Sequence, residues 1–186
     1  MSPHLQVLTS RFEGLRDTVV SSWSGVEMAL TEGRQGGDVW EDSTIPYLQM
    51  LSVDLVRGDG SRFRITTEQA DDLWGLSIRE FTDVEEGESN WSGIFRDGAL
   101  DYLPFGRISN VELTSMGGLI DRVCLSVGRS RIQFVPGEVY EQSNGSLRVA
   151  THDESILVQV DGAHPRQNKA WVVNPLPAAS RRLNRD

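Results

Sequence analysis

Alternation of apolar and polar residues along most of the chain is the feature that most constrains its fold. From Leu51 to Leu55 every second side chain is apolar, and the same period of two continues, with interruptions, to Ile156–Val160. A period of two places alternate side chains on opposite faces of an extended strand, whereas a helix repeats every 3.6 residues. The segments that separate these runs are too short for the crossover helices that parallel strands need. The pattern therefore predicts antiparallel strands.

Turn residues divide the alternating segments from one another. Asn144-Gly145 is the strongest hairpin signal, because both residues tolerate the left-handed backbone of a type I′ turn. The other predicted turns contain Gly58-Asp59-Gly60, Met116-Gly117-Gly118-Leu119, Gly128-Arg129-Ser130 and Pro136-Gly137. Closely spaced strands of this kind predict an antiparallel meander of about eight or nine strands, forming a curled sheet, a sandwich or a partial barrel.

The beginning of the chain has a different period. Apolar residues recur there at alternating spacings of three and four, which places them on one face of a helix. These residues are Leu5, Leu8, Phe12, Leu15 and Val19. The segment from Trp23 to Leu30 is compatible with a first strand. We therefore expect an α+β fold that is mainly β and carries one N-terminal helix.

The length and the end of the chain suggest a single domain. The 186 residues fit one domain, which we assign to residues 1–174, and residues 175–186 begin with Pro175-Leu176-Pro177 and form a basic, extended tail. Cys124 is the single cysteine, so an intramolecular disulfide is excluded. Neither a signal peptide nor an apolar run of about 20 residues is visible, so we expect no membrane contact and a cytoplasmic protein.

The charge of the chain limits the partners that it can bind. The net charge is −9, but residues 166–186 carry +4, so the first 165 residues carry −13. A negative body repels phosphates, which argues against binding to nucleic acid and favours a basic protein partner. The basic residues comprise seventeen arginines and one lysine, which is compatible with a bacterial coding sequence rich in G and C.

No motif for cofactor, nucleotide or metal chemistry is present. Gly58-Asp59-Gly60 lacks the third glycine of a dinucleotide-binding turn, and Lys169 is not part of a phosphate-binding loop. His4, His152 and His164 lie far apart, without the spacing of a zinc site. We therefore expect neither a cofactor nor a bound metal.

The weak candidates for catalysis are His152, Asp153 and Glu154. They lie between two predicted strands, where adjacent polar residues usually form a turn. Neighbours on an extended chain point in opposite directions, so these three residues cannot form a triad among themselves. We expect no enzymatic activity. The alternatives are an enzyme on a β scaffold that uses these residues, and a structural or assembly subunit that pairs through a sheet edge.

An acidic stretch from Glu68 to Asp101 is the main functional signal. It contains ten acidic residues against two arginines, a net charge of −8, and large aromatic residues lie among them. Aromatic anchors within a negative field are typical of an interface for a basic partner. The alternative is a solvated loop whose aromatic residues reach the core. The predicted contacts are Asp71, Asp72, Trp74, Asp83, Glu85, Glu86, Glu88 and Trp91.

The chain also resembles the small acidic immunity proteins that neutralise bacterial polymorphic toxins. The resemblance rests on the meander of residues 51–78, on Pro136-Gly137-Glu138-Val139, and on the strand of residues 155–160 after Asp153-Glu154. Many such proteins cover the basic cleft of a nuclease and have no activity of their own. The resemblance implies a cytoplasmic toxin inhibitor that occludes a basic toxin, and it assigns no individual residues.

Overall fold

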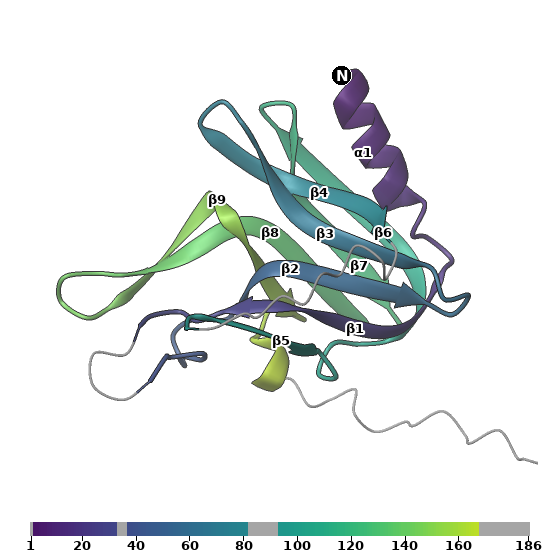
Figure 1. The fold of residues 1–186 in the computed structure, drawn as a ribbon. Helices are drawn as coiled ribbons and strands as arrows, with labels where there is room; N and C mark the ends of the chain where they lie inside the picture. Colours follow the sequence, from purple (N-terminus) through teal and green to yellow (C-terminus); the bar gives the residue numbers. More distant parts are fainter. Residues whose placement is uncertain (1, 33–36, 82–92, 168–186) are drawn as a thin grey trace, which may run out of the picture.

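The computed structural model describes residues 2–32, 37–81 and 93–167, which form a mainly antiparallel β structure with one N-terminal helix (Figure 1). The helix α1 spans Pro3–Glu13, and a short 3-10 turn, η2, spans Pro165–Gln167. The strands are β1 (Val19–Met28), β2 (Leu48–Arg57), β3 (Arg62–Ala70), β4 (Leu73–Phe81), β5 (Phe95–Ala99), β6 (Gly106–Met116), β7 (Leu119–Val127), β8 (Ser130–Glu141) and β9 (Leu147–Val160). The predicted α+β, mainly β fold is confirmed.

The strands form a single sheet that closes on itself. Their order is β4-β3-β2-β9-β8-β7-β6-β1-β5, and β1 also pairs with β2. The β1–β2 pairing closes a ring of β1, β2, β9, β8, β7 and β6, while β3, β4 and β5 extend beyond the ring. Closure gives each of these six strands a neighbour on both sides, although β1 and β6 pair only at Val19–Arg107 and Val20–Gly106. The architecture is therefore a six-stranded barrel with three additional strands.

Closure of the barrel depends on a glycine. Gly25 of β1 pairs with Val53 of β2 in the antiparallel register. A Cβ atom on Gly25 would overlap the carbonyl oxygen of Ser52 and would lie 2.9 Å from Cε of Met50. Only a residue without a side chain therefore allows β1 and β2 to approach each other here.

The barrel interior is filled by apolar side chains, and α1 packs beside one end of it. Leu5, Leu8 and Phe12 of the helix are buried, and Leu15, which follows the helix, is buried with them. The prediction for Val19 was wrong, because this residue begins β1 and is 44% exposed. The helix ends at Glu13, and the chain then turns at Asp17, whose φ is 64°.

The predicted turns at residues 58–60, 117–118, 128–129 and 144–145 are confirmed as hairpin connections. The predicted type I′ conformation at Asn144-Gly145 was wrong, because Gly145 has a positive φ (80°) but Asn144 does not. The prediction of a turn at Pro136-Gly137 was wrong. Pro136 lies within β8, where its missing N–H interrupts the ladder with β9 without ending the strand. A Cβ atom on Gly137 would lie 2.5 Å from the Ala150 carbonyl oxygen, so the ladder resumes only with glycine at this position.

A bulge in β9 accompanies this interruption. Pro136 pairs with Ile156 and Gly137 pairs with Thr151, which leaves residues 152–155 outside the ladder. His152, Asp153 and Glu154 therefore lie within one long strand, and not in a turn between two strands as we predicted. Beyond the bulge, the β8–β9 hairpin projects away from the rest of the sheet (Figure 1).

Within the described part of the chain, no helix has the length and apolar character needed to cross a membrane. Cys124 is buried in β7. The predicted tail, residues 175–186, lies outside the described residues.

Candidate functional site

The predicted contacts that lie within the described residues are all on the β3–β4 hairpin. Asp71 and Asp72 are exposed in the two-residue turn between β3 and β4, and Trp74 is half-buried in β4 opposite Gln69. Asp71 has a φ of 53°, a left-handed conformation that aspartate tolerates better than most residues. Asp71 therefore has a local role in the turn, whether or not it also contacts a partner.

The other predicted contacts, Asp83, Glu85, Glu86, Glu88 and Trp91, lie outside the described residues. The acidic stretch contributes the end of β3, all of β4 and all of β5, and because β1 pairs with β2, the strands β3, β2 and β1 lie between β4 and β5. The described parts of the stretch are therefore divided between separate regions of the sheet.

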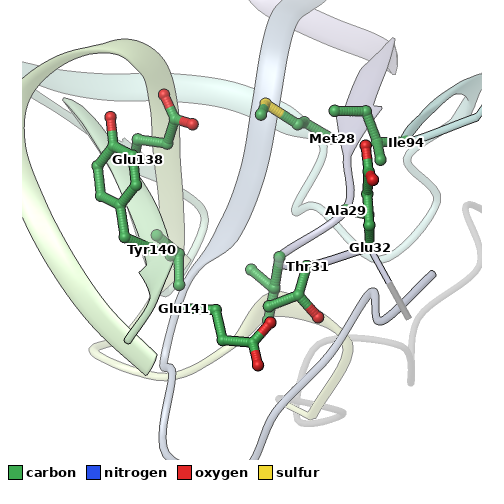
Figure 2. Close-up of a pocket in the computed structure, with 10 residues that line it drawn as sticks. Met28, Ala29, Thr31, Glu32, Ile94, Glu138, Tyr140 and Glu141 are labelled. Atoms are coloured by element: carbon green, nitrogen blue, oxygen red, sulfur yellow. The ribbon is translucent and has the colours of Figure 1, made fainter. Parts of the chain in front are cut away.

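A cleft near the projecting β8–β9 hairpin gathers acidic residues that the sequence analysis did not select. Its volume is about 250 Å³. One wall is formed by residues 28–32, at and after the end of β1, together with Ile94, and the other wall is formed by residues 138–141 of β8. Figure 2 shows Glu138 and Tyr140 on one side of the cleft and Met28 and Ile94 on the other. We refer to this feature as the acidic cleft, because Glu32, Glu138 and Glu141 all line it.

Gln49 of β2 holds the two walls of the acidic cleft together. Its side chain is buried, with the residue only 1% exposed. The backbone N–H of Val139 donates a hydrogen bond to Oε1 of Gln49 (2.6 Å), and Nε2 of Gln49 donates to the carbonyl oxygen of Ala29 (3.4 Å). The N–H of Ala29 in turn donates to the carbonyl oxygen of Ile94 (2.8 Å). These bonds join four chain segments, so the width of the cleft is set by the fold.

A small apolar cluster, separate from the barrel core, supports the same region. It contains Leu30 and Val139 from the walls of the acidic cleft, together with Ile45, Val135 and Leu157. Burial of these side chains fixes the positions of both walls, while the carboxylates line the cleft.

Negative charge accumulates around Glu138. Its pKa is raised by partial burial and by the nearby carboxylates of Asp153 and Glu154. The hydroxyl of Tyr140 donates a hydrogen bond to Oδ2 of Asp153 (2.8 Å), and burial together with this bond raises the pKa of Tyr140. Among the described residues, no arginine, lysine or histidine forms an ion pair with Glu138. The site therefore has unbalanced negative charge in a partly desolvated setting.

The weak catalytic candidates lie beside the acidic cleft but do not line it. Ser155, the last residue of the bulge, donates a hydrogen bond to Sδ of Met28 (3.4 Å), which places the bulge against one wall. Asp153 is engaged with Tyr140, and Glu154 is exposed. Their side chains do not converge on a common point in a cavity, so the arrangement gives no support to a catalytic role. Within residues 2–32, 37–81 and 93–167, no group of three metal-ligating side chains is present.

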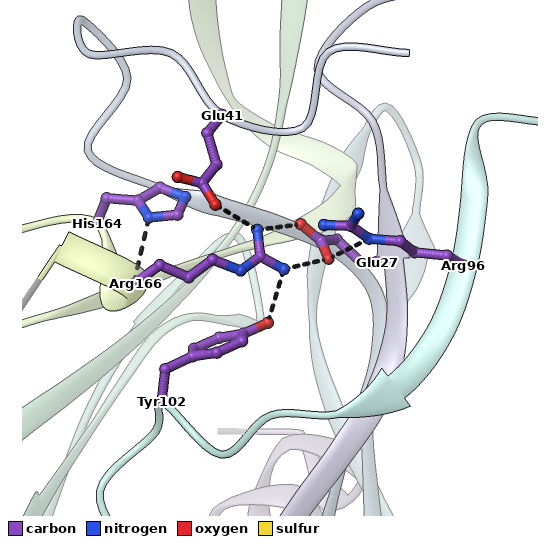
Figure 3. Close-up of polar contacts among 6 residues, drawn as sticks. All are labelled: Glu27, Glu41, Arg96, Tyr102, His164 and Arg166. Carbon is purple, nitrogen blue, oxygen red and sulfur yellow. Dashed lines mark hydrogen bonds and ion pairs between the residues drawn. The ribbon is translucent and has the colours of Figure 1, made fainter. Parts of the chain in front are cut away.

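A second polar group, the Glu27 cluster, was not anticipated from the sequence (Figure 3). Glu27 is only 4% exposed, and its carboxylate accepts hydrogen bonds from Nε of Arg96 (2.8 Å) and from Nη1 of Arg166 (2.8 Å). Arg166 also donates to Glu41 (3.0 Å) and to the hydroxyl of Tyr102 (3.1 Å). Burial raises the pKa of Tyr102 to about 12.

The Glu27 cluster is internally balanced, since two carboxylates meet two guanidinium groups. His164 lies at its edge and is 1% exposed. Nδ1 of His164 accepts a hydrogen bond from the backbone N–H of Arg166 (3.3 Å), and burial lowers the pKa of the imidazole. A cavity of about 160 Å³ adjoins the cluster. Because its charges are already paired, the cluster fastens η2 to β1. Nε2 of His164, at its edge, is buried and forms no hydrogen bond within the described part of the chain.

Local sequence contains little that would identify either group. Glu138 and Tyr140 are ordinary polar positions of an alternating strand, and Gln49 stands between two apolar residues. Their importance arises from chain segments that are distant in sequence. In comparisons with known proteins, no family model matches the chain, and no curated protein or solved structure matches it either.

Proposed function

We propose that the protein binds a basic protein partner through the acidic cleft. The observation that carries the proposal is the half-buried Glu138, whose charge is opposed by no ion pair among the described residues and is reinforced by Asp153 and Glu154. Glu32 and Glu141 add negative charge to the same cleft. A field of this sign accelerates encounter with a cationic protein and disfavours acidic competitors.

A binding role agrees better with the cleft than a catalytic role does. Tyr140 is 40% exposed beside the carboxylates, and tyrosine is enriched among residues that dominate binding energy at interfaces. The walls are already joined through Gln49, so binding needs little ordering of the protein. The residues that would have to act as acid, base and nucleophile do not converge there.

The specific form of the proposal is that of an immunity protein. In this form the chain acts in the bacterial cytoplasm and neutralises a basic toxin, such as a nuclease, by covering its active surface. Asp71, Asp72 and Trp74 would then supply a second contact on the β3–β4 hairpin. The contacts predicted at residues 83–91 remain part of this proposal.

Co-expression with the product of the neighbouring open reading frame tests this function. We expect that product to inhibit growth alone, and growth to recover when the present chain is co-expressed. Purified proteins should form a complex whose association slows as the salt concentration rises, because exposed charges are screened. The double variant Glu32→Gln/Glu141→Gln should associate several-fold more slowly than wild type.

The matched control for this experiment is Glu13→Gln/Glu80→Gln, which removes the same charge from exposed positions on α1 and β4. The control should retain the wild-type association rate apart from a small loss of long-range attraction. The proposal is wrong if the neighbouring product is harmless, or if a complex forms with a rate that neither salt nor the cleft variant changes.

A further inference from the structure

We infer that the acidic cleft receives one arginine side chain of the partner, and that Glu138 and Tyr140 are the residues that recognise its guanidinium group. This inference rests on the proposed function and specifies the chemistry of its central contact.

The Glu27 cluster shows how this protein holds a guanidinium group. Nη1 and Nη2 of Arg166 both donate to the carboxylate of Glu27, and the guanidinium carbon lies 4.7 Å from the ring centroid of Tyr102. Arg96 donates to the same carboxylate, and its guanidinium carbon lies 3.8 Å from the ring centroid of Trp40. Each arginine is thus bound by a carboxylate and an aromatic ring together.

The same combination occurs in a separate part of the barrel. Nε and Nη2 of Arg64 donate to the two carboxylate oxygens of Asp54, each at 2.7 Å. The guanidinium carbon of Arg64 lies 4.4 Å from the ring centroid of Phe81. The planar guanidinium favours this setting, because it can donate two parallel hydrogen bonds to a carboxylate in its plane while an aromatic ring packs on its face.

The acidic cleft places a carboxylate and an aromatic ring beside each other. Glu138 and Tyr140 are two positions apart on β8, so both side chains project from the same face of the strand, as Figure 2 shows. Glu138 forms no ion pair with a described residue, in contrast to Glu27 and Asp54. A guanidinium group from outside would complete the arrangement and relieve the repulsion from Asp153 and Glu154.

The size and lining of the acidic cleft also fit a single side chain. Its volume of about 250 Å³ lies below the range of roughly 300–1,000 Å³ that is typical of sites for drug-sized ligands. Met28 and Ile94 face Glu138 across the cleft and provide apolar surface for the methylene stem of the side chain. Lysine would gain less, because its ammonium group is strongly hydrated and cannot bind a carboxylate through two parallel bonds.

Titration of the isolated protein with a small arginine probe tests this inference without the partner. The probes are N-acetyl-arginine amide, N-acetyl-lysine amide, and N-acetyl-citrulline amide, which has nearly the shape of the arginine probe without its charge. In NMR spectra we expect saturable shifts at Met28, Ile94 and Tyr140 with the arginine probe. The lysine probe should bind several-fold more weakly, and the citrulline probe should cause no saturable shift.

Glu138→Gln should weaken binding of the arginine probe by at least about tenfold, while Glu13→Gln should leave it unchanged. A readout that needs no variant is the pKa of Glu138 in the wild-type protein, which should fall on addition of the arginine probe. Equal binding of the arginine and citrulline probes, shifts elsewhere on the surface, or an unchanged pKa of Glu138 would each overturn the inference.

The two proposals can fail separately. If Glu138→Gln binds and neutralises the basic partner as well as wild type does, the arginine inference is wrong and the immunity function stands. If the isolated cleft binds the arginine probe selectively but the neighbouring product is harmless, the arginine inference stands and the immunity function is wrong.

Discussion

Replacement of Arg166 by methionine probes the energetic weight of the Glu27 cluster. Methionine retains much of the apolar stem but removes the guanidinium group, so Glu27 loses two of its hydrogen bonds and keeps only the one from Arg96. The side chain of Glu27 is 5% exposed, so water cannot readily replace the lost donor. The variant therefore leaves a buried carboxylate partly uncompensated.

The magnitude follows from this geometry. Removal of one partner from a buried ion pair destabilises a protein by about 3–5 kcal/mol. Arg96 remains 2.8 Å from Glu27, and the side chain of Arg166 is itself 21% exposed, so the loss should be smaller. We expect the free energy of unfolding to fall by about 2–3 kcal/mol, and the melting temperature of a chain of this size to fall by about 5–10 °C.

Urea denaturation of a double-mutant cycle measures this interaction. The cycle compares Glu27→Gln, Arg166→Met and the double variant, which removes both charges. We expect the double variant to lose at least about 1.5 kcal/mol less than the sum of the single losses, because the second substitution no longer exposes an unpaired buried charge.

The control is Arg131→Met. Arg131 forms an ion pair with Glu112 in which both side chains are more than half exposed. Its loss should stay below about 1 kcal/mol. If the losses of the two single variants add up to the loss of the double variant within about 0.5 kcal/mol, the argument that these two charges stabilise each other is refuted.

Three further predictions concern closure, pH and a buried hydrogen bond. Gly25→Ala should destabilise the fold by about 3 kcal/mol, because its Cβ would overlap the backbone of β2. The control is Gly98→Ala, at the residue of β5 that pairs with Gly25, which should change stability by less than about 0.5 kcal/mol because no atom lies within 4 Å of the new Cβ. If Gly25→Ala and Gly98→Ala lose equal stability in urea denaturation, the proposed role of Gly25 in closure is wrong. Burial lowers the pKa of His164 below its ordinary value of 6.5, so the unfolded chain binds a proton first as the pH falls. The free energy of unfolding of the wild-type protein should therefore decrease below about pH 6.5. His164 contributes at most about 1.4 kcal/mol per pH unit to this decrease, until the pH reaches the pKa of His164 in the folded protein. In the same pH series, the free energy of unfolding of His164→Asn should depend less steeply on pH. Trp23→Phe removes the hydrogen bond from Nε1 to the carbonyl oxygen of Pro104 (2.7 Å) and should cost about 1–3 kcal/mol in the same assay, whereas no loss would mean that this carbonyl finds another donor.

The strands and most of their connections were determined by local sequence. Apolar alternation specifies which face of a strand is buried, and Gly60 and Gly145 supply the positive φ values of their hairpin connections. Such signals act over a few residues, so they can be read without the fold. Pro136-Gly137 was misread because the same residue types serve both a turn and a bulge, and only the pairing with β9 distinguishes the two.

Closure of the barrel and the construction of both polar groups were decided by tertiary structure. Glu27 and Arg166 are 139 positions apart, and Gln49 contacts Val139 across 90 positions. Apolar periodicity shows which side chains leave the solvent, but it carries no information about which strand lies beside which. The acidic cleft therefore emerges only when the ends of β1, β5 and β8 are brought together, and negative charge counted along the chain could not locate it.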